Sequence, residues 1–413
     1  MNSQDDIRVD GRGNALEASE AGRKAPRRAG RRVLNLAAIC ALLMFASMIL
    51  PPYLFIETRP GASMSVPEFF AESGRRFQEL LQFLTGAGGS YEFIPCGVLL
   101  AAMMGAALGM CGSVYQGAFR NPLAAPKTLG VMSGGALGSF IYFMTPLAQM
   151  GPQFISEDPT GVNLAEVAQW YASLDPLSYL WVMYGQQFCS VAGCFLIVGI
   201  VVFISSVSGR GKLSNITLII AGQVFSMGIT GLILYMRYVY TATGDADQAE
   251  AMMEIENYAL GGTYTTQDLA LVGIPLLACI VAVLLMRNKL TMLSFGDEEA
   301  QSMGVDVNKW RYIMVAICTF MTGWAISFMG HVAYLGFISA HVSRRLVGPD
   351  MRYLLPASLF VGAIFITFFY MLTRCGLPFA PQGSVGMYTS IVGAALFLVI
   401  ALRQRGRSTS DWQ

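Results

Sequence analysis

The sequence predicts an all-α polytopic membrane protein with about ten transmembrane helices and both termini in the cytoplasm. Of its 413 residues, 54% are hydrophobic and only 13% are charged, roughly half the charged share of a typical soluble domain. The apolar residues fall in long blocks, and a spanning helix needs about 20 of them to cross ~30 Å of hydrocarbon. Lysine and arginine gather on alternate connecting segments. This composition argues against a disordered chain or a soluble enzyme, and the net charge of +1 gives no indication of a nucleic-acid partner.

The chain begins with a basic, polar segment and a first apolar block. Residues 1–32 show no helical periodicity, and we expect a disordered basic cytoplasmic tail that anionic lipid attracts to the inner membrane surface. Block 33–56 follows a cluster of basic residues, as the core of a signal peptide does, but no small-residue cleavage site comes after it. We therefore interpret this block as an uncleaved membrane anchor.

Nine further apolar blocks predict the remaining spans. Two of them are separated by little more than Gly330 and His331, so the number of spans stays open by one or two. Residues 33–402 are expected to form one transmembrane domain, and residues 403–413 a cytoplasmic C-terminal tail. The nine blocks are 94–118, 128–149, 184–207, 216–239, 268–286, 312–329, 332–347, 353–373 and 386–402.

The positions of lysine and arginine predict the orientation. With the N-terminus inside, the inner segments hold 22 of the 27 cations, and only Arg59, Arg75, Arg76, Arg237 and Arg374 fall outside. Cytoplasmic loops are enriched in Lys and Arg because these residues resist translocation. Three outer segments, at 57–93, 150–183 and 240–267, are long. The last contains an acidic run at 245–256, which we interpret as a solvated helix or loop because it lacks the glycine and terminal glutamate of a calcium loop.

Glycine is frequent, at 44 residues, and some of it is spaced for close helix packing. The pairs Gly105–Gly109 and Gly134–Gly138 each place two small residues four positions apart, a spacing that lets helix backbones approach closely. They indicate a tightly packed bundle, which could include a dimer face. The eight cysteines contain no Cys-x-x-Cys pair and are interpreted as small apolar residues rather than as a metal site or disulfide framework.

The predicted spans lack an energy source of their own. They contain almost no Asp, Glu or His that could relay protons, and His331 and His341 are interpreted as packing residues at helix ends. Gly211-Lys212 is followed by Leu213, so no phosphate-binding loop of the Walker A type is present. A polytopic protein with neither device must be a passive channel or must take its energy from another chain.

The inner loop after the second block carries the most specific motif. Residues 116–130 read QGAFRNPLAAPKTLG, in which the Asn-Pro and Ala-Pro steps break the helix. This loop resembles the signature of permease subunits of the ABC importers for iron–siderophore complexes, haem and cobalamin, the type II importers. The resemblance covers about residues 94–402. Further matches follow in the same order: LIIAG at 218–222, LSFGDEEAQSMGV at 293–305, HVSRRLVGPD at 341–350, LLP at 354–356 and GMYTSIVG at 386–393.

The resemblance implies roles for particular residues. Segment 291–309 is expected to form two short helices seated on a separate ATPase, with Asp297 and Glu298 facing that partner. The implied ATPase-coupling residues are Leu293, Phe295, Gly296, Asp297, Glu298, Ala300, Met303 and Gly304. The implied cytoplasmic gate consists of Asn121, Leu123, Ser214 and Asn215, and Arg374 is the implied docking residue for a binding protein.

The resemblance also implies a transmembrane permease in the bacterial cytoplasmic (inner) membrane that works by alternating access. The expected partners are two ABC ATPase subunits, an extracellular substrate-binding lipoprotein, and a second permease copy in a homodimer or a related heterodimer. We expect this chain to bind no cofactor or metal and to contain no catalytic residue, with ATP and magnesium on the partner ATPase.

Departures from the family pattern lie mainly toward the outer face and the last spans. The family's GPIGF-x-G stretch is GHVAYLG at 330–336, and the segment before the second span lacks an arginine pair. The ligand therefore stays open among siderophore, haem and cobalamin. The alternative hypothesis is a passive channel or an uncoupled membrane receptor, which predicts no stoichiometric ATPase partner.

Overall fold

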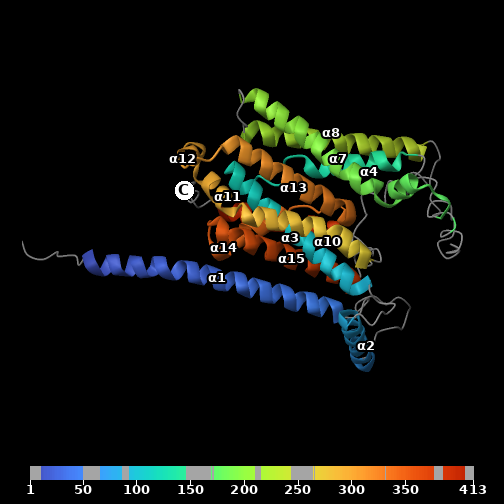
Figure 1. Cartoon of the computed structure of the whole chain (residues 1–413), viewed down its shortest axis with the longest axis horizontal. Helices are drawn as coiled ribbons and strands as arrows, with labels where there is room; N and C mark the ends of the chain where they lie inside the picture. The colour runs from blue at the N-terminus through green and yellow to red at the C-terminus, as the bar shows by residue number, and fades with distance from the viewer. Residues whose placement is uncertain are drawn as a thin grey trace, which may run out of the picture.

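The computed structural model is built of helices throughout the residues it describes (Figure 1). Those residues are 11–49, 66–85, 93–145, 172–209, 215–242, 266–330, 332–375 and 385–404, with residues 169 and 264. The helices are α1 (Gly11–Ile49), α2 (Val66–Thr85), α3 (Phe93–Phe119), α4 (Val131–Phe143), α7 (Pro176–Ser208), α8 (Asn215–Ala242), α10 (Thr266–Leu285), α11 (Arg287–Phe295), α12 (Asp297–Ser302), α13 (Val307–Met329), α14 (Leu335–Val347), α15 (Met351–Cys375) and α16 (Val385–Gln404).

The prediction of an all-α polytopic membrane protein is confirmed. Seven helices are long and apolar enough to cross a membrane, namely α1, α3, α7, α8, α10, α13 and α15. The other three predicted blocks contain α4 and α14, of 13 residues each, and α16, whose apolar part is Tyr388–Val399. Every predicted block therefore contains a helix, but α4 and α14 cover only about 20 Å each at 1.5 Å per residue.

The N-terminal region contains more helix than the sequence indicated. Residues 11–32, expected to be disordered, form the first part of α1, and the outer segment 57–93 contains α2. Segment 11–32 is rich in Ala and Arg, which are strong helix formers. In α2, hydrogen bonds from Arg75 and Arg76 to Glu72 hold the pKa of that carboxyl below its usual value.

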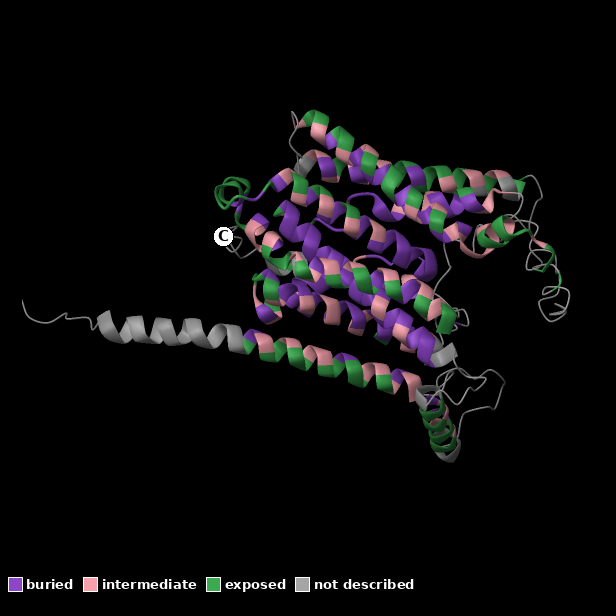
Figure 2. Ribbon diagram, viewed as in Figure 1, coloured by how far each residue is buried: buried purple, intermediate pink, exposed green. Residues whose placement is uncertain are grey.

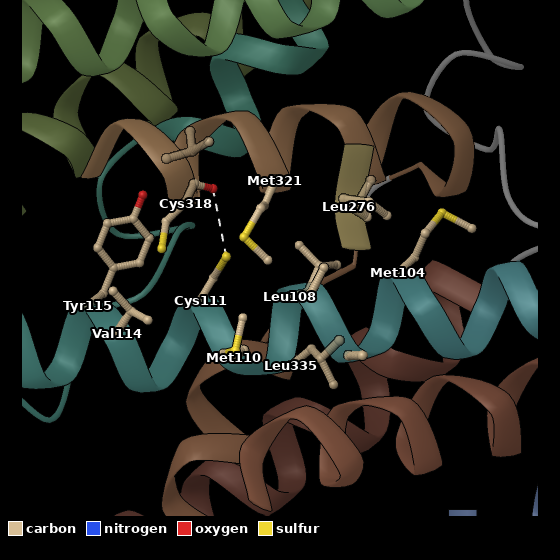
Figure 3. Packing of buried hydrophobic residues seen from close by; sticks show 14 of the residues in the cluster. Met104, Leu108, Met110, Cys111, Val114, Tyr115, Leu276, Cys318, Met321 and Leu335 are labelled. Carbon is tan, nitrogen blue, oxygen red and sulfur yellow. Dashed lines mark hydrogen bonds between the residues drawn. The ribbon is translucent and has the colours of Figure 1, made fainter. Parts of the chain in front are cut away.

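Helix α3 forms the centre of the bundle (Figure 2). Its side chains from Leu100 to Phe119 are largely buried among neighbours on α10, α13, α14 and α15. Figure 3 shows α3 between α13, which carries Cys318 and Met321, and the start of α14 at Leu335. The Cys111 thiol donates a hydrogen bond to the carbonyl of Cys318 over 3.7 Å. The described cysteines are all free, as the sequence predicted.

The two glycine pairs bring helices together within this chain. A Cβ added to Gly109 would lie 2.6 Å from the carbonyl oxygen of Ser358 on α15, and one added to Gly138 would lie 1.9 Å from that of Cys189 on α7. The expected close packing is confirmed. Both glycine faces are occupied by helices of the same chain, and the suggestion that the bundle includes a dimer face stays a prediction.

Two crossings of the bundle are broken into a helical and a non-helical part. Segment 120–130 forms turns that run from the inner end of α3 back into the bundle, where α4 begins (Figure 1). In the second crossing, α13 ends at Met329 and residues 332–334 lead back to the start of α14. This explains why α4 and α14 are short: each is the helical half of a discontinuous crossing.

Candidate coupling surface and gate segment

The inner end of α3 leads into a sharply turned segment. Arg120 has a positive φ of 49°, an uncommon conformation for a residue other than glycine. The Asn121 side-chain oxygen accepts a hydrogen bond of 2.9 Å from the backbone N–H of Leu123, the Asx turn that asparagine commonly forms. Thr128 then accepts from the N–H of Ala125 at 2.9 Å. These bonds stabilise the turns of segment 120–130, called here the gate segment.

Arg311 on α13 links the inner end of α3 to α12. Its Nε donates 2.8 Å to the carbonyl oxygen of Ala118, in the last turn of α3. Its two terminal nitrogens donate 2.9 and 2.6 Å to the two carboxylate oxygens of Asp297. Only 3% of Arg311 is exposed, and the planar guanidinium suits such a two-pronged pairing. Asp297 is thereby fixed at the first turn of α12.

Two glycines set the path of the chain through α11 and α12. Gly296, which joins the helices, has φ 150°, and Gly304, after α12, has φ 76°. Both values lie in the region that L side chains avoid. Both glycines therefore permit turns that a residue with a side chain would strain.

The two short helices present a buried face and an exposed face. Leu293 and Ala300 are fully buried against the bundle. Phe295 is 59% exposed and Met303 is 44% exposed. Helices α11 and α12 lie near the inner end of the molecule (Figure 1, left). We call Phe295, Glu298 and Met303 the coupling surface. Apolar side chains exposed beyond the ends of the spans are typical of a protein–protein contact.

The structure places Asp297 differently from Glu298. Glu298 is exposed, as expected for a residue that faces a partner. The Asp297 side chain is about half exposed, but its carboxylate is bound by Arg311. We therefore assign Asp297 to positioning α12 within this chain.

The candidate gate residues are described in part. Leu123 is 51% exposed at the inner end of the gate segment, next to Asn121. Asn215 is the first residue of α8, but its side chain and all of Ser214 lie outside the described residues. The contact between α8 and the gate segment lies further along, because a Cβ on Gly222 would lie 2.2 Å from the carbonyl oxygen of Thr128.

The remaining predicted residues lie away from these surfaces. Arg374 is in the last turn of α15, with its side chain outside the described residues, and His331 and the acidic run at 245–256 also lie outside them. His341 packs as predicted, stacked on Phe337 with 5.3 Å between ring centroids, but it lies in the middle of α14 and not at a helix end. No group of three or more metal-ligating side chains occurs in the described residues.

Sequence reasoning missed Arg311, which appeared only as one inner cation among many. Ala118 is 193 residues away along the chain and binds through its backbone carbonyl, and Asp297, 14 residues away, lies on another helix. The motif around Asp297 was the one sequence feature that pointed to such a partner, because a half-buried carboxylate needs a cation nearby.

Comparison with known proteins gives three findings. The sequence profile of the FecCD transport family matches residues 91–403. The hemin transport system permease protein of Yersinia pestis is 30% identical over 75% of this chain and 81% of its own length. The cobalamin import system permease protein of Halobacterium salinarum is 28% identical over 75% of this chain and 71% of its own length.

A solved structure supports the fold. A metal-chelate type ABC transporter in an inward-facing conformation superposes with a TM-score of 0.64 at 20% identity, over 91% of this chain and 99% of that one. At this level of identity the likeness concerns the arrangement of helices alone.

Proposed function

The chain belongs to the FecCD transport family, and we propose on that premise that it is the membrane permease of an ATP-driven importer for an iron chelate, haem or cobalamin. Its apolar helices and its permease relatives make it a multi-pass protein of the bacterial inner membrane. Family membership favours this function over a passive channel or an uncoupled receptor.

The observation that carries the proposal is the coupling surface. This surface lies on α11 and α12, whose faces toward the bundle are buried. Gly296 and the Arg311–Asp297 pair fix the connection between these two helices. A rigid element with exposed Phe295 and Met303 suits a partner that must push on the permease. Because Arg311 also binds the last turn of α3, a displacement of α12 is transmitted directly to the central helix.

The gate segment is the proposed moving part at the cytoplasmic side. It lies between the inner end of α3 and Gly222 of α8, and it exposes Leu123. Tilting of α3 against α8 would change the space available to this segment. Transport is then an alternation between two arrangements of the same helices, biased by ligand and by nucleotide.

The proposed assembly contains other chains. Two ABC ATPase subunits would bind ATP and magnesium and dock on the coupling surface. A second permease copy, identical or related, would complete the pathway, and an extracellular lipoprotein would deliver the ligand near the outer ends of the spans, where Arg374 lies. The permease itself contributes no catalytic residue.

The coupling role is tested with the double variant Phe295→Ala/Met303→Ala in the complex with its ATPase, reconstituted in liposomes. Both side chains are exposed, so their truncation leaves the packing of the permease intact. We expect normal membrane insertion, reduced copurification of the ATPase and a loss of about tenfold in ligand-stimulated ATP hydrolysis, as for a contact that contains hot-spot residues. The matched control is Leu402→Ala, another exposed apolar residue, near the inner end of α16.

Two outcomes would contradict the proposal. If the double variant hydrolysed ATP and imported ligand like the wild type, the coupling surface would lie elsewhere. If the wild-type permease copurified with no ATPase, the importer itself would be the wrong function.

A further inference from the structure

The two discontinuous crossings meet inside the bundle. Pro126, in the gate segment, lies against Gly336 in the first turn of α14, where an added Cβ would come within 3.3 Å of the Pro126 ring. The next residue, Lys127, places its ammonium nitrogen 4.7 Å from the ring centroid of Tyr334, the residue that precedes α14. The gate segment therefore contacts the residues at which the second crossing becomes helical.

This meeting point lies inside the helical bundle, away from the inner ends of α3 and α7. Gly336 also packs against Gly112 of α3, whose added Cβ would lie 1.8 Å from the Gly336 carbonyl oxygen. Gly112 is seven residues, or about 10 Å, from the inner end of α3 at Phe119. Gly130, at the end of the gate segment, touches Ile197, which is about 16 Å from the inner end of α7. Lys127 lies between these two contacts along the chain.

The Lys127 ammonium has no carboxylate partner among the described residues. The ion pairs found there involve Arg75, Arg76 and Arg311. The ring of Tyr334 covers one side of the ammonium, an attractive but weak contact. The rest of the lysine side chain is half-buried.

A lysine at this depth is costly if it faces lipid, and such residues almost always face a water-filled cavity or the bundle interior. Irregular backbone at membrane depth follows the same rule, because it is tolerated where protein or water satisfies its polar groups. Both arguments place the exposed part of Lys127 against water or the bundle interior rather than against lipid. An unpaired cation that reaches water attracts anions.

We infer that Lys127, held by Tyr334 at the junction of the two broken crossings, is a specificity-determining residue that favours ligands carrying carboxylate, catecholate or other anionic groups. This inference rests on the proposed importer function and narrows its ligand class. It favours anionic ferric chelates and haem, with its two carboxylates, over neutral or cationic ligands. Tyr334 is the positioning residue, because its ring directs the ammonium while the lysine meets the ligand.

The test uses the complete complex, with its ATPase and binding protein, in liposomes. Import is measured for probes matched in size but not in charge: haemin and its dimethyl ester, and an anionic ferric tricatecholate beside a neutral ferric trihydroxamate. We expect the wild type to favour the anionic probe of a pair. Lys127→Gln should lower import of that probe about tenfold and change import of a neutral one less than twofold, while Lys127→Arg should retain the preference.

Controls separate charge from structure. Arg352→Gln removes an exposed cation of the inner rim and should change neither probe. Tyr334→Phe keeps the ring and should keep the preference. Size-exclusion profiles of all variants should match the wild type.

The remaining outcomes overturn the inference. The inference fails if the wild type imports only neutral or cationic probes. It also fails if Lys127→Gln lowers the import of both probes of a pair equally, or lowers the import of neither. A wild-type complex that imports no chelate, haem or cobalamin overturns the proposed function instead, and the two failures are thereby distinguished.

Discussion

Helices α3 and α8 have nearly the same length and the same mean hydropathy, but they occupy opposite environments. The most apolar stretch of α3 is 89% buried inside the protein, whereas that of α8 is 17% buried. Side chains of α8 such as Val224 and Met227 are exposed along most of its length. Hydropathy therefore predicts that a segment crosses the membrane but does not predict where it lies in the bundle.

Glycine contacts distinguish the two helices. On α3, added Cβ atoms at Gly105, Gly109 and Gly112 would all lie within 2.6 Å of backbone atoms of α14 or α15. On α8, only Gly222 is approached in this way, whereas Gly228 and Gly231 have no atom within 4 Å. A helix with many such contacts is enclosed, and one with a single contact is attached at one point.

The largest effect is expected for Gly112→Ala. The added Cβ would overlap the Gly336 carbonyl oxygen. Because the atoms that it meets are backbone atoms of Gly336, α3 and α14 would have to separate. Overpacking of this kind costs about 3 kcal/mol. The measurement is the temperature at which the detergent-solubilised protein loses its monodisperse size-exclusion peak, which we expect to fall sharply.

The matched control is Gly199→Ala on α7, where an added Cβ meets nothing within 4 Å. It should leave that temperature unchanged. If Gly112→Ala proved as stable as Gly199→Ala, the enclosed position of α3 would be wrong.

Much of the fold could be predicted from sequence because membrane insertion depends on local composition. Every predicted apolar block contains a helix, and the segment with Gly296 and Gly304 could be recognised because its motif is local. The broken crossings could not be predicted. Hydropathy is averaged over a window and gives no information on how deep a residue lies in the bundle. From sequence, segments 120–130 and 330–334 are therefore interpreted as a loop or as the ends of spans.

Parts of the candidate site were hidden for a related reason. The Lys127–Tyr334 contact joins residues far apart in the chain, and the Arg311–Asp297 pair joins two different helices, through packing that the sequence does not state. The motif identified the coupling segment, but not that Asp297 is held by a buried arginine of α13. Tertiary pairing, rather than residue type, decides that role.

A moderate effect is expected for Gly222→Ala. At Gly222, α8 closely approaches the backbone of another segment, as α3 does at its glycines. The added Cβ would lie 2.2 Å from the Thr128 carbonyl oxygen, but the gate segment is not a helix and can move more easily than α14. We expect a loss of about 2 kcal/mol and altered reactivity of a cysteine introduced at Leu123, read with a water-soluble thiol reagent. Reactivity and stability equal to the wild type would show that α8 and the gate segment are not in contact.

The smallest effect is expected for Gly228→Ala. This glycine lies on the exposed side of α8 with open space around it, and alanine is the better helix former by up to about 1 kcal/mol. The size-exclusion transition temperature should therefore stay the same or rise slightly, and import should be unchanged. A clear loss of assembly would instead mean that a second permease copy packs closely on this face of α8. The contrast between the two helices would then describe the single chain only, because the partner would enclose α8 as α14 and α15 enclose α3.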